Sequence, residues 1–522
     1  MPSEGSLCYK VYFSLPRTSL VSFPRFFFLC SSPPGGDAVV YSLLIVTRQT
    51  FPFLKNSPFK IVLLLLVLVL ILLPMQWMPA CQIGSYEIKR VGLLADVLPE
   101  DLHPKDEGGE VTDTLLPALA AIQKVREAQP QAAVPSKPAP KGLVCIEDYA
   151  DANQRGMLPF YQALAQRKQL NRPVRIAYFG DSFIEVDILT GALRTLLQEK
   201  FGGNGVGFLD IAPPYAANRS TVHQRYGGWN AFCVLDKGKY QAARLNIGQR
   251  YFVPQSTAWT EISGVHQPRL DTTEVHTLYL RANAPLQVGV KLNQGTMLAL
   301  QAEGTGKVEA LTRKGRSGRT RWQVPTAAGL TCWGVAEESA RGVILDNLSL
   351  RGSSGTTLTE IPQEVLRQLH DVRPYDLIVL QFGLNVANKK QINYSSYAHQ
   401  MKTVIEHLKR GFPEAGILLI GVGDREDRLA DGELHTLPGI HSLIKYQQNL
   451  AAETRVAFWN LYEGMGGEGS IRRMAEAKPA EAGKDYTHIN HRGGQRIART
   501  LYKSLVYGYE QYQHHANETS NR

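Results

Sequence analysis

Residues 174–182 read VRIAYFGDS, and this stretch carries the strongest signal for the architecture of the chain. Its first six residues form a nearly continuous apolar run, which is typical of a buried strand in a parallel sheet. The run ends in Gly180-Asp181-Ser182, and residues 188–201 (ILTGALRTLLQEKF) then place apolar side chains at helical spacing. We therefore predict that Ser182 lies at the carboxyl edge of a sheet, where α/β proteins place their sites.

Two stretches farther along the chain have the same strand-then-turn character. Residues 343–350 form a strand-like run that leads into RGSSGTT (351–357), and residues 376–381 (DLIVLQ) form another that leads into Gly383-Leu384-Asn385. Gly355 would let a backbone N–H approach a substrate closely. The amide of Asn385 could donate to a developing oxyanion, although an asparagine in this position is often only a turn residue.

A third pattern lies near the C-terminus, where residues 484–488 read KDYTH and a helical pattern follows at 495–507. Asp485 and His488 are three residues apart in one turn, so the carboxylate can hold the imidazole in the tautomer that accepts a serine proton. His488 and His491 could alternatively be a metal pair. No third ligand of matching type lies close by, which makes a metal site the weaker interpretation.

The ordered series GDS, SG-T, GxN and DxxH resembles the SGNH (GDSL-like) hydrolase family over residues 142–207 and 343–512. The resemblance implies a three-layer α/β fold with a flavodoxin-like parallel sheet, and acyl transfer without cofactor or metal. It assigns the nucleophile to Ser182, the base to His488 and the acid to Asp485. The implied oxyanion donors are the Ser182 N–H, the Gly355 N–H (or that of Gly352) and the side chain of Asn385. No G-x-S-x-G motif is present, which argues against a standard α/β-hydrolase fold.

Ser182 and Gly355 are 173 residues apart, far more than in a plain SGNH enzyme. The region between them contains short β-rich runs separated by turn signals, and this spacing predicts an inserted β-sandwich over residues 212–342. The runs are 249–253, 274–280, 286–292, 297–301, 322–324 and 330–335.

An SGNH domain interrupted in this way resembles the bacterial peptidoglycan O-acetyl esterases, through CIEDYA (145–150), GDSFIEVDILTGALR (180–194), FGGNGVGFLDIA (201–212) and LSLRGSSGTTLTEIP (348–362). The resemblance implies removal of acetyl from a sugar hydroxyl of an O-acetylated glycan. Four residues after the first motif could line a glycan cleft, or could be ordinary packing and surface residues: Tyr215, Arg219, Arg225 and Trp229. Glu185 and Asp187 are interpreted as first-turn acids of the following helix.

The N-terminal part contains residues 61–73 (IVLLLLVLVLILL), which with the next seven residues can cross a hydrocarbon layer of roughly 30 Å. Lys55 and Lys60 precede this run, so the remainder of the chain is expected outside the cytoplasm, in the periplasm or cell envelope. A cleaved signal peptide fits equally well. Cys81 follows a poor lipoprotein-like site, and lipidation there is a further alternative.

Composition and charge exclude several other classes of protein. Apolar residues make up 44% and charged residues 20% of the 522 residues, which is a balance that rules out disorder over most of the chain. The net charge is +10, but the positive residues are not gathered on one element, so we expect no nucleic-acid partner. Six cysteines occur without a CxxC motif; Cys233 and Cys332 could form a disulfide or stay as thiols.

The expected organisation has six parts: a doubtful extension at 1–60, a membrane or signal segment at 61–80, a stalk at 81–141, the SGNH domain at 142–211 and 343–515, and the insertion at 212–342. The predicted function is an exported, or membrane-anchored, serine esterase acting on cell-wall O-acetyl groups. An O-acetyltransferase with the same triad and a non-catalytic protein that binds wall glycan are the alternatives.

Overall fold

The computed structural model describes residues 81–83, 86–88, 138–150, 156–264 and 272–520. The chain divides into two compact units, residues 1–109 and 110–522. In the first unit, β1 (Cys81–Ile83) and β2 (Tyr86–Ile88) pair in antiparallel fashion. The expected extension 1–60, the membrane or signal segment 61–80 and most of the expected stalk lie outside the described residues. Within the described ranges no helix has the length and apolarity needed to cross a bilayer.

The second unit is built on a six-stranded sheet in the order β14-β4-β15-β16-β19-β3. The first five strands run parallel, and only the edge strand β3 is antiparallel to its neighbour. The bounds are β3 (Glu147–Asp148), β4 (Val174–Gly180), β14 (Val343–Ser349), β15 (Leu377–Gln381), β16 (Gly416–Ile420) and β19 (Ala457–Trp459). The apolar runs at 174–179, 343–350 and 376–381 are thus strands β4, β14 and β15, which lie side by side.

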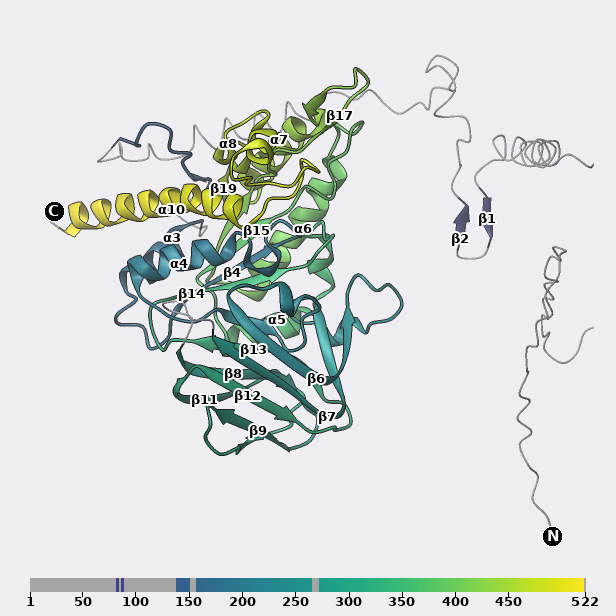
Figure 1. Cartoon of the computed structure of the whole chain (residues 1–522), viewed down its shortest axis with the longest axis vertical. Helices are drawn as coiled ribbons and strands as arrows, with labels where there is room; N and C mark the ends of the chain where they lie inside the picture. The colour runs from purple at the N-terminus through teal and green to yellow at the C-terminus, as the bar shows by residue number, and fades with distance from the viewer. Residues whose placement is uncertain (1–80, 84–85, 89–137, 151–155, 265–271, 521–522) are drawn as a thin grey trace, which may run out of the picture. The chain divides into compact units, whose positions relative to one another are not determined.

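Helices cover both faces of this sheet (Figure 1). One face packs against α3 (Leu158–Ala165), α4 (Thr190–Phe201), α8 (Leu461–Met465), α9 (Ser470–Glu476) and α10 (His491–Ser520). The other face packs against α5 (Gln363–Val372), α6 (Ser395–Gly411) and α7 (Pro438–Glu453). The predicted α/β class with a helix-covered parallel sheet is therefore confirmed.

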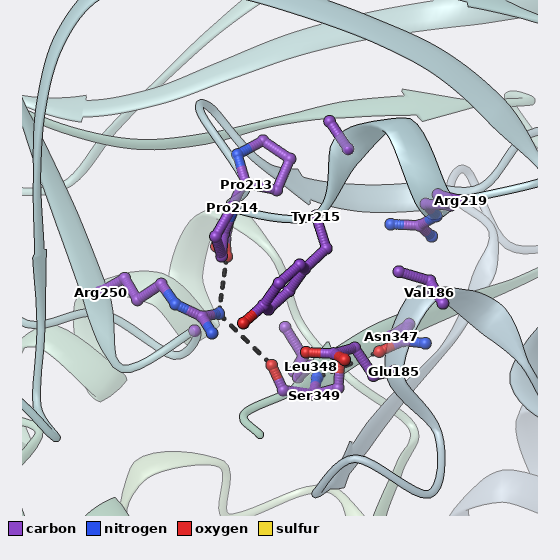
Figure 2. Close-up of a pocket in the computed structure, with 13 residues that line it drawn as sticks. Glu185, Val186, Pro213, Pro214, Tyr215, Arg219, Arg250, Asn347, Leu348 and Ser349 are labelled. Atoms are coloured by element: carbon purple, nitrogen blue, oxygen red, sulfur yellow. Dashed lines mark hydrogen bonds and ion pairs between the residues drawn. The ribbon is translucent and has the colours of Figure 1, made fainter. Parts of the chain in front are cut away.

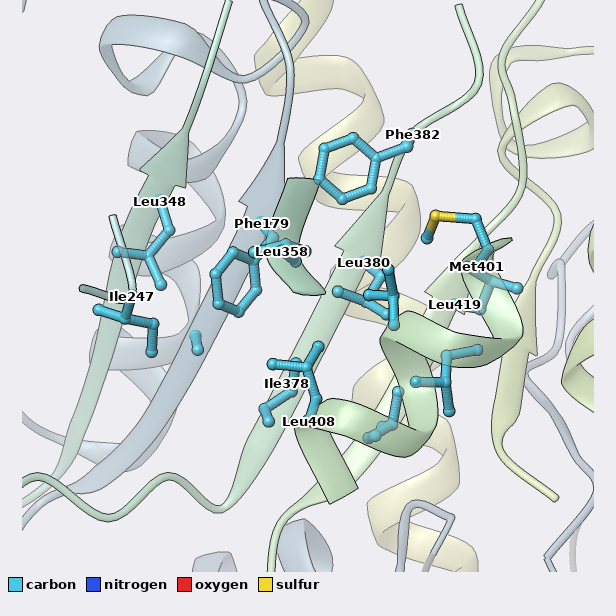
Figure 3. Close-up of a cluster of buried hydrophobic side chains, with 14 of the residues drawn as sticks. Phe179, Ile247, Leu348, Leu358, Ile378, Leu380, Phe382, Met401, Leu408 and Leu419 are labelled. Carbon is cyan, nitrogen blue, oxygen red and sulfur yellow. The ribbon is translucent and has the colours of Figure 1, made fainter. Parts of the chain in front are cut away.

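Alternate residues of the central strands point to opposite faces, and both sets are apolar. Figure 3 shows the core beneath one face, where Phe179 of β4 and Leu380 of β15 lie near Met401 and Leu408 of α6. These side chains are all at most 1% exposed. Burial on both faces explains why the strands are continuous apolar runs instead of alternating ones.

Between α4 and β14 the chain forms a nine-stranded antiparallel sheet, with the path β10-β9-β12-β7-β13-β8-β11 and β6 and β5 paired to β7 and β13. The bounds are β5 (Gly207–Asp210), β6 (Val222–Cys233), β7 (Arg250–Gly264), β8 (Thr273–Arg281), β9 (Leu286–Leu292), β10 (Leu298–Ala302), β11 (Glu309–Ser317), β12 (Arg319–Val324) and β13 (Thr331–Glu338). A separate two-stranded sheet joins β17 (Glu426–Arg428) to β18 (Leu434–Thr436).

The antiparallel region is one continuous sheet, and its two ends share a core. The 15-residue strand β7 pairs with β12 through residues 258–263 and with β13 at Phe252, so it belongs to both halves. Val290 of β9, Trp322 of β12 and Leu280 of β8 lie in one buried cluster. An additional antiparallel sheet is thus present where the sequence predicts a sandwich. A sandwich has two separate sheets, whereas here β7 pairs with strands of both halves and makes the sheet continuous.

Candidate active site

Ser182 is the second residue after β4, at the carboxyl end of the parallel sheet, and His488 lies three residues before α10. The Ser182 Oγ is 3.1 Å from the His488 Nε2. The His488 Nδ1 is 2.7 Å from the Asp485 Oδ2. Three side chains predicted from two separate motifs therefore form one continuous series of hydrogen bonds, with the geometry of a nucleophile, a base and an orienting carboxylate.

The carboxylate of Asp485 is kept ionised by its hydrogen bonds. Burial alone would raise its pKa, but the His488 side chain and the backbone N–H groups of Thr487 and His488 outweigh this effect, so the pKa lies below its ordinary value. An ionised acceptor at the Nδ1 favours the tautomer in which the Nε2 can take a proton from serine. The side chains of His488 and Asp485 are 48% and 53% exposed, which leaves the site open to water.

Three groups were expected to donate to the oxyanion, and two of them already donate to acceptors within the protein. The amide Nδ2 of Asn385 donates to the Asp181 Oδ2 at 2.8 Å and to the Ser353 carbonyl at 2.9 Å. The Gly355 N–H donates to the Ser353 Oγ at 3.0 Å. The Ser182 N–H has no acceptor among the described residues. Because an amide nitrogen has two hydrogens, Asn385 is fully engaged in this arrangement.

Gly355 occupies a position that another residue would disturb. Its φ is +90°, and a Cβ there would lie 2.6 Å from the ring of Phe382. Gly352 also has a positive φ, of +78°, but it faces open space. Close packing therefore singles out Gly355 over Gly352 as the glycine held next to the site.

Asp181 was not among the predicted site residues, although it precedes the serine. Its side chain is buried, with its residue 2% exposed, and its Oδ1 accepts from the Phe183 N–H at 2.9 Å. Burial raises its pKa to about 6, against the lowering effect of the Phe183 N–H and His488. Asp181 is thus a buried carboxylate that holds the Asn385 amide and titrates close to neutrality.

Asp187 is also more than the first-turn helix acid that the sequence suggested. It ends the short helix η4 (Glu185–Asp187), its φ is +65°, and the φ of the preceding Val186 is +49°. Its buried carboxylate accepts from Arg194 at 3.0 Å, from Arg219 at 2.9 Å and from Thr221 at 2.6 Å. Burial would raise its pKa, but the two arginines hold the pKa well below its ordinary value. No helical spacing in the sequence reveals this pair, because Asp187 lies in a turn before α4 and its conformation is not helical.

A cavity of about 60 Å³ lies beside this turn, between Glu185, Ser349 and the segment 213–219 (Figure 2). Tyr215 stands in its middle and is 42% exposed. Arg250 borders it through bonds to Asp210 at 2.8 Å and to the Ser349 carbonyl at 3.3 Å. Tyr215 and Arg219 thus line this cavity as candidates from the sequence, whereas Arg225 and Trp229 are on β6 and do not.

The remaining site alternatives concern metals and cysteines. Within the described residues, no group of three or more His, Cys, Asp or Glu side chains is arranged to hold a metal ion. Cys145, Cys233 and Cys332 are free thiols. Cys332 belongs to the buried cluster of the antiparallel sheet, while Cys233 packs against the cluster of the parallel sheet, so the two side chains serve different cores.

Comparison with known proteins yields a likeness of fold. No family model and no curated protein matches the chain. A solved peptidoglycan O-acetylesterase is 20% identical, with a TM-score of 0.58 over 70% of this chain and 99% of that one. Two family two carbohydrate esterases are less similar. The one from Cellvibrio japonicus is 9% identical, with a TM-score of 0.24 over 56% of this chain and 99% of that one. The one from Clostridium thermocellum is 9% identical, with a TM-score of 0.26 over 49% of this chain and 94% of that one. The first comparison confirms the predicted resemblance at the level of the fold.

Proposed function

We propose that this chain is an SGNH-type serine esterase that removes O-acetyl groups from a cell-wall glycan, with peptidoglycan as the substrate. The observation that carries the proposal is the hydrogen-bonded chain from the Ser182 Oγ through His488 to Asp485. The shared fold with a peptidoglycan O-acetylesterase supports the choice of substrate.

The reaction follows from the positions of these atoms. The His488 Nε2 takes the proton of Ser182 as the Oγ attacks the acetyl carbonyl carbon, which forms a tetrahedral intermediate. When the intermediate collapses, the bond between the acetyl carbon and the sugar oxygen breaks, and His488 returns its proton to that oxygen. A water molecule, deprotonated by His488, then attacks the acetyl-enzyme and releases acetate and free Ser182.

The oxyanion is stabilised by the Ser182 N–H, the Gly355 N–H and the Asn385 amide. Ser353 accepts hydrogen bonds from the last two donors in this structure, through its hydroxyl and its carbonyl. A developing oxyanion is a stronger acceptor than either neutral oxygen. The substrate therefore takes these donors from Ser353, while Asp181 retains the other hydrogen of the Asn385 amide.

The surroundings of the serine fit a hydroxylated substrate. The cavity at Tyr215 combines an exposed ring with carboxylate and guanidinium groups, and the Arg351 guanidinium lies 5.1 Å from the centre of that ring. Rings that stack on sugars, next to polar groups that bind hydroxyls, are what a glycan site requires. Residues 61–80 would carry the enzyme to, or across, the membrane, so that it acts outside the cytoplasm.

The same triad could pass acetyl to a second glycan hydroxyl instead of water. The exposure of His488 and Asp485 favours hydrolysis, because water reaches the acetyl-enzyme freely.

The test is incubation of the full chain with O-acetylated peptidoglycan, and with the same material after chemical removal of its acetyl groups. We expect acetate release from the first only, and none from a Ser182→Ala variant that keeps its thermal unfolding midpoint. Acetyl transfer to an added glycan acceptor without free acetate would establish the transferase instead. Binding to the glycan without either product would leave only a binding protein.

A further inference from the structure

One face of the antiparallel sheet carries exposed or partly exposed positive charge on strands β6, β12 and β9. Strand register places Arg225 of β6, Glu261 of β7, Arg321 of β12 and Lys291 of β9 in one row. The next row contains His223, Ser263 and Arg319. The residues between these rows, such as Gln224 and Ile262, are buried on the opposite face. We call the exposed surface of these two rows the basic face.

The charges of the basic face are largely uncompensated. Arg225 and Arg319 are exposed, and neither forms an ion pair in the described part of the chain. Glu261 is the carboxylate in these rows, and its Oε2 lies 3.5 Å from the Arg321 Nη1. Residues 313–318 (RKGRSG), which lead into Arg319, contain three further Lys or Arg and no acid, although they belong to β11 and the turn after it. The sequence predicts that the positive residues are not gathered on one element. The fold nevertheless brings several of them together on the basic face.

An aromatic platform borders the basic face. Trp259 is in the third row, beside Gly227 of β6 and Gln323 of β12. A Cβ on Gly227 would lie 2.9 Å from the Trp259 Nε1, so the glycine leaves room for the indole to lie close to the sheet. The Arg321 guanidinium is 4.1 Å from the indole centre. Arg321 therefore covers one face of the indole, and the unpaired Arg225 lies in the neighbouring row. An aromatic ring and cations on one surface suit a sugar chain that carries acidic groups.

The basic face begins next to the proposed active site. Thr221 and Arg219, just before β6, bind the carboxylate of Asp187 in the turn that follows Ser182. At roughly 3.3 Å per strand residue, His223 and Arg225 lie only about 7 and 13 Å beyond Thr221. A glycan strand whose acetyl group reaches Ser182 can therefore extend along β6.

We propose that the basic face is a second binding surface for the glycan strand, and that it binds the free carboxylates of the polymer on which the enzyme acts. This inference rests on the proposed function and names a determinant of its substrate. The surface contacts no reacting atom, so it contributes to the KM of polymeric substrates and not to turnover of small ones.

The experiment compares the full chain with an Arg225→Ala/Arg319→Ala variant. Both side chains are exposed and unpaired, so the fold should be unaffected. On O-acetylated peptidoglycan we expect the KM to rise by about five-fold at low salt with kcat unchanged, since each surface charge contributes modestly. Amidation of the polymer's carboxylates should raise the wild-type KM similarly and erase the difference between the two proteins.

The matched control is Lys237→Ala/Lys239→Ala, which removes two exposed charges from the loop after the other end of β6. We expect its KM to equal that of the wild type. An unchanged KM in the arginine variant, or a variant effect that persists on the amidated polymer, would overturn the inference. The same holds if the variant loses only its binding to vesicles of phosphatidylglycerol and phosphatidylcholine, which would assign the surface to a membrane. Turnover of p-nitrophenyl acetate and acetate release from the polymer test the proposed function separately.

Discussion

Asp181 illustrates how a single buried carboxylate can serve a site at the expense of stability. It is nearly inaccessible to solvent, its hydrogen-bond partners are the neutral Phe183 N–H and Asn385 amide, and burial raises its pKa to about 6. A folded-state pKa above the unfolded value means that the folded protein binds the proton more tightly. Stability is then greatest below the unfolded pKa, and it falls as the pH rises through about 6.

We therefore predict that Asp181→Asn stabilises the protein at pH 7.5 while it impairs turnover. The neutral amide avoids the cost of burying a charge, which is up to about 3 kcal/mol for a shift of about two pKa units. Its NH2 group cannot accept one of the two hydrogen bonds that the carboxylate accepts, which reduces the gain by about 1 kcal/mol. The gain should disappear below about pH 4, where the wild-type carboxyl is protonated in both states. Denaturant unfolding at several pH values measures this, and a destabilised variant at pH 7.5 would contradict the account.

The second prediction at this scale concerns Asn385. If its amide exchanges the Ser353 carbonyl for the oxyanion, Asn385→Ala should lower kcat on a small acetyl ester by about 10²–10³-fold, as expected for loss of one oxyanion donor. The KM should change little, because the interaction forms in the transition state. Steady-state kinetics of the wild type and the variant measure this effect. An unchanged kcat would show that Asn385 is not an oxyanion donor.

At the scale of elements, the turn between β4 and α4 has a strained backbone. Val186 and Asp187 both have positive φ, which is uncommon for residues other than glycine and rare for a β-branched one. Such a conformation persists when its surroundings hold it. Here the bonds from Arg194, Arg219 and Thr221 to Asp187 connect the turn to α4 and to the start of β6.

We predict that Asp187→Asn has the opposite effect on stability from Asp181→Asn. It removes the charge that compensates two arginines, with side chains 1% and 13% exposed, and breaking such buried pairs costs about 3–5 kcal/mol. Activity should fall as well, because the turn also positions Ser182. Thermal unfolding of the two Asp→Asn variants in parallel provides the comparison; equal shifts would refute the distinct roles.

The sequence predicts most of the elements where burial imposes a simple pattern. The apolar runs at 174–179 and 376–381 and the β-rich runs at 286–292 and 330–335 correspond to strands. Strand β6 was missed, because a register shift at Gly227 and Trp229 and a largely exposed surface break its alternation. Strand β11 was missed because its second half is rich in charged residues and glycine.

For the site, motifs anticipated the meeting of Ser182, His488 and Asp485, since each motif lies at a strand end or before a helix. Motifs could not reveal that Ser353 engages both Gly355 and Asn385, because this depends on side-chain placement across two loops. Likewise, the burial of Asp181 and Asp187 results from packing by segments far away in the chain. The catalytic roles of Ser182, His488 and Asp485 stay predictions, as do the positioning roles of Asp181 and Asp187.

At the scale of the whole second unit, a buried ionic network joins the two sheets. Arg373, which follows α5, binds Asp346 of β14 at 2.8 Å and Glu338 of β13 at 2.5 Å. Glu338 also binds Arg175 of β4 at 2.8 Å. Burial would raise the pKa of Glu338, but the two arginines lower it to about 2. The antiparallel sheet is thus fixed to the parallel sheet by charges within the protein.

We predict that Arg373→Met destabilises the unit by about 3–5 kcal/mol, because it leaves two carboxylates buried with less compensation. Arg351→Met is the control: its side chain is 56% exposed and pairs with Glu185, so its loss should cost at most about 1 kcal/mol. Calorimetry of both variants gives the comparison. Similar shifts in the two would show that the network does not hold the sheets together.

The most direct test of the central claim, that His488 activates Ser182 as a nucleophile, is covalent labelling with a fluorophosphonate followed by peptide mass mapping. We predict a single modified residue, Ser182, and loss of both labelling and esterase activity in His488→Ala. Esterase activity that survives with Ser182 unlabelled, or label that maps to a different serine, would contradict the account.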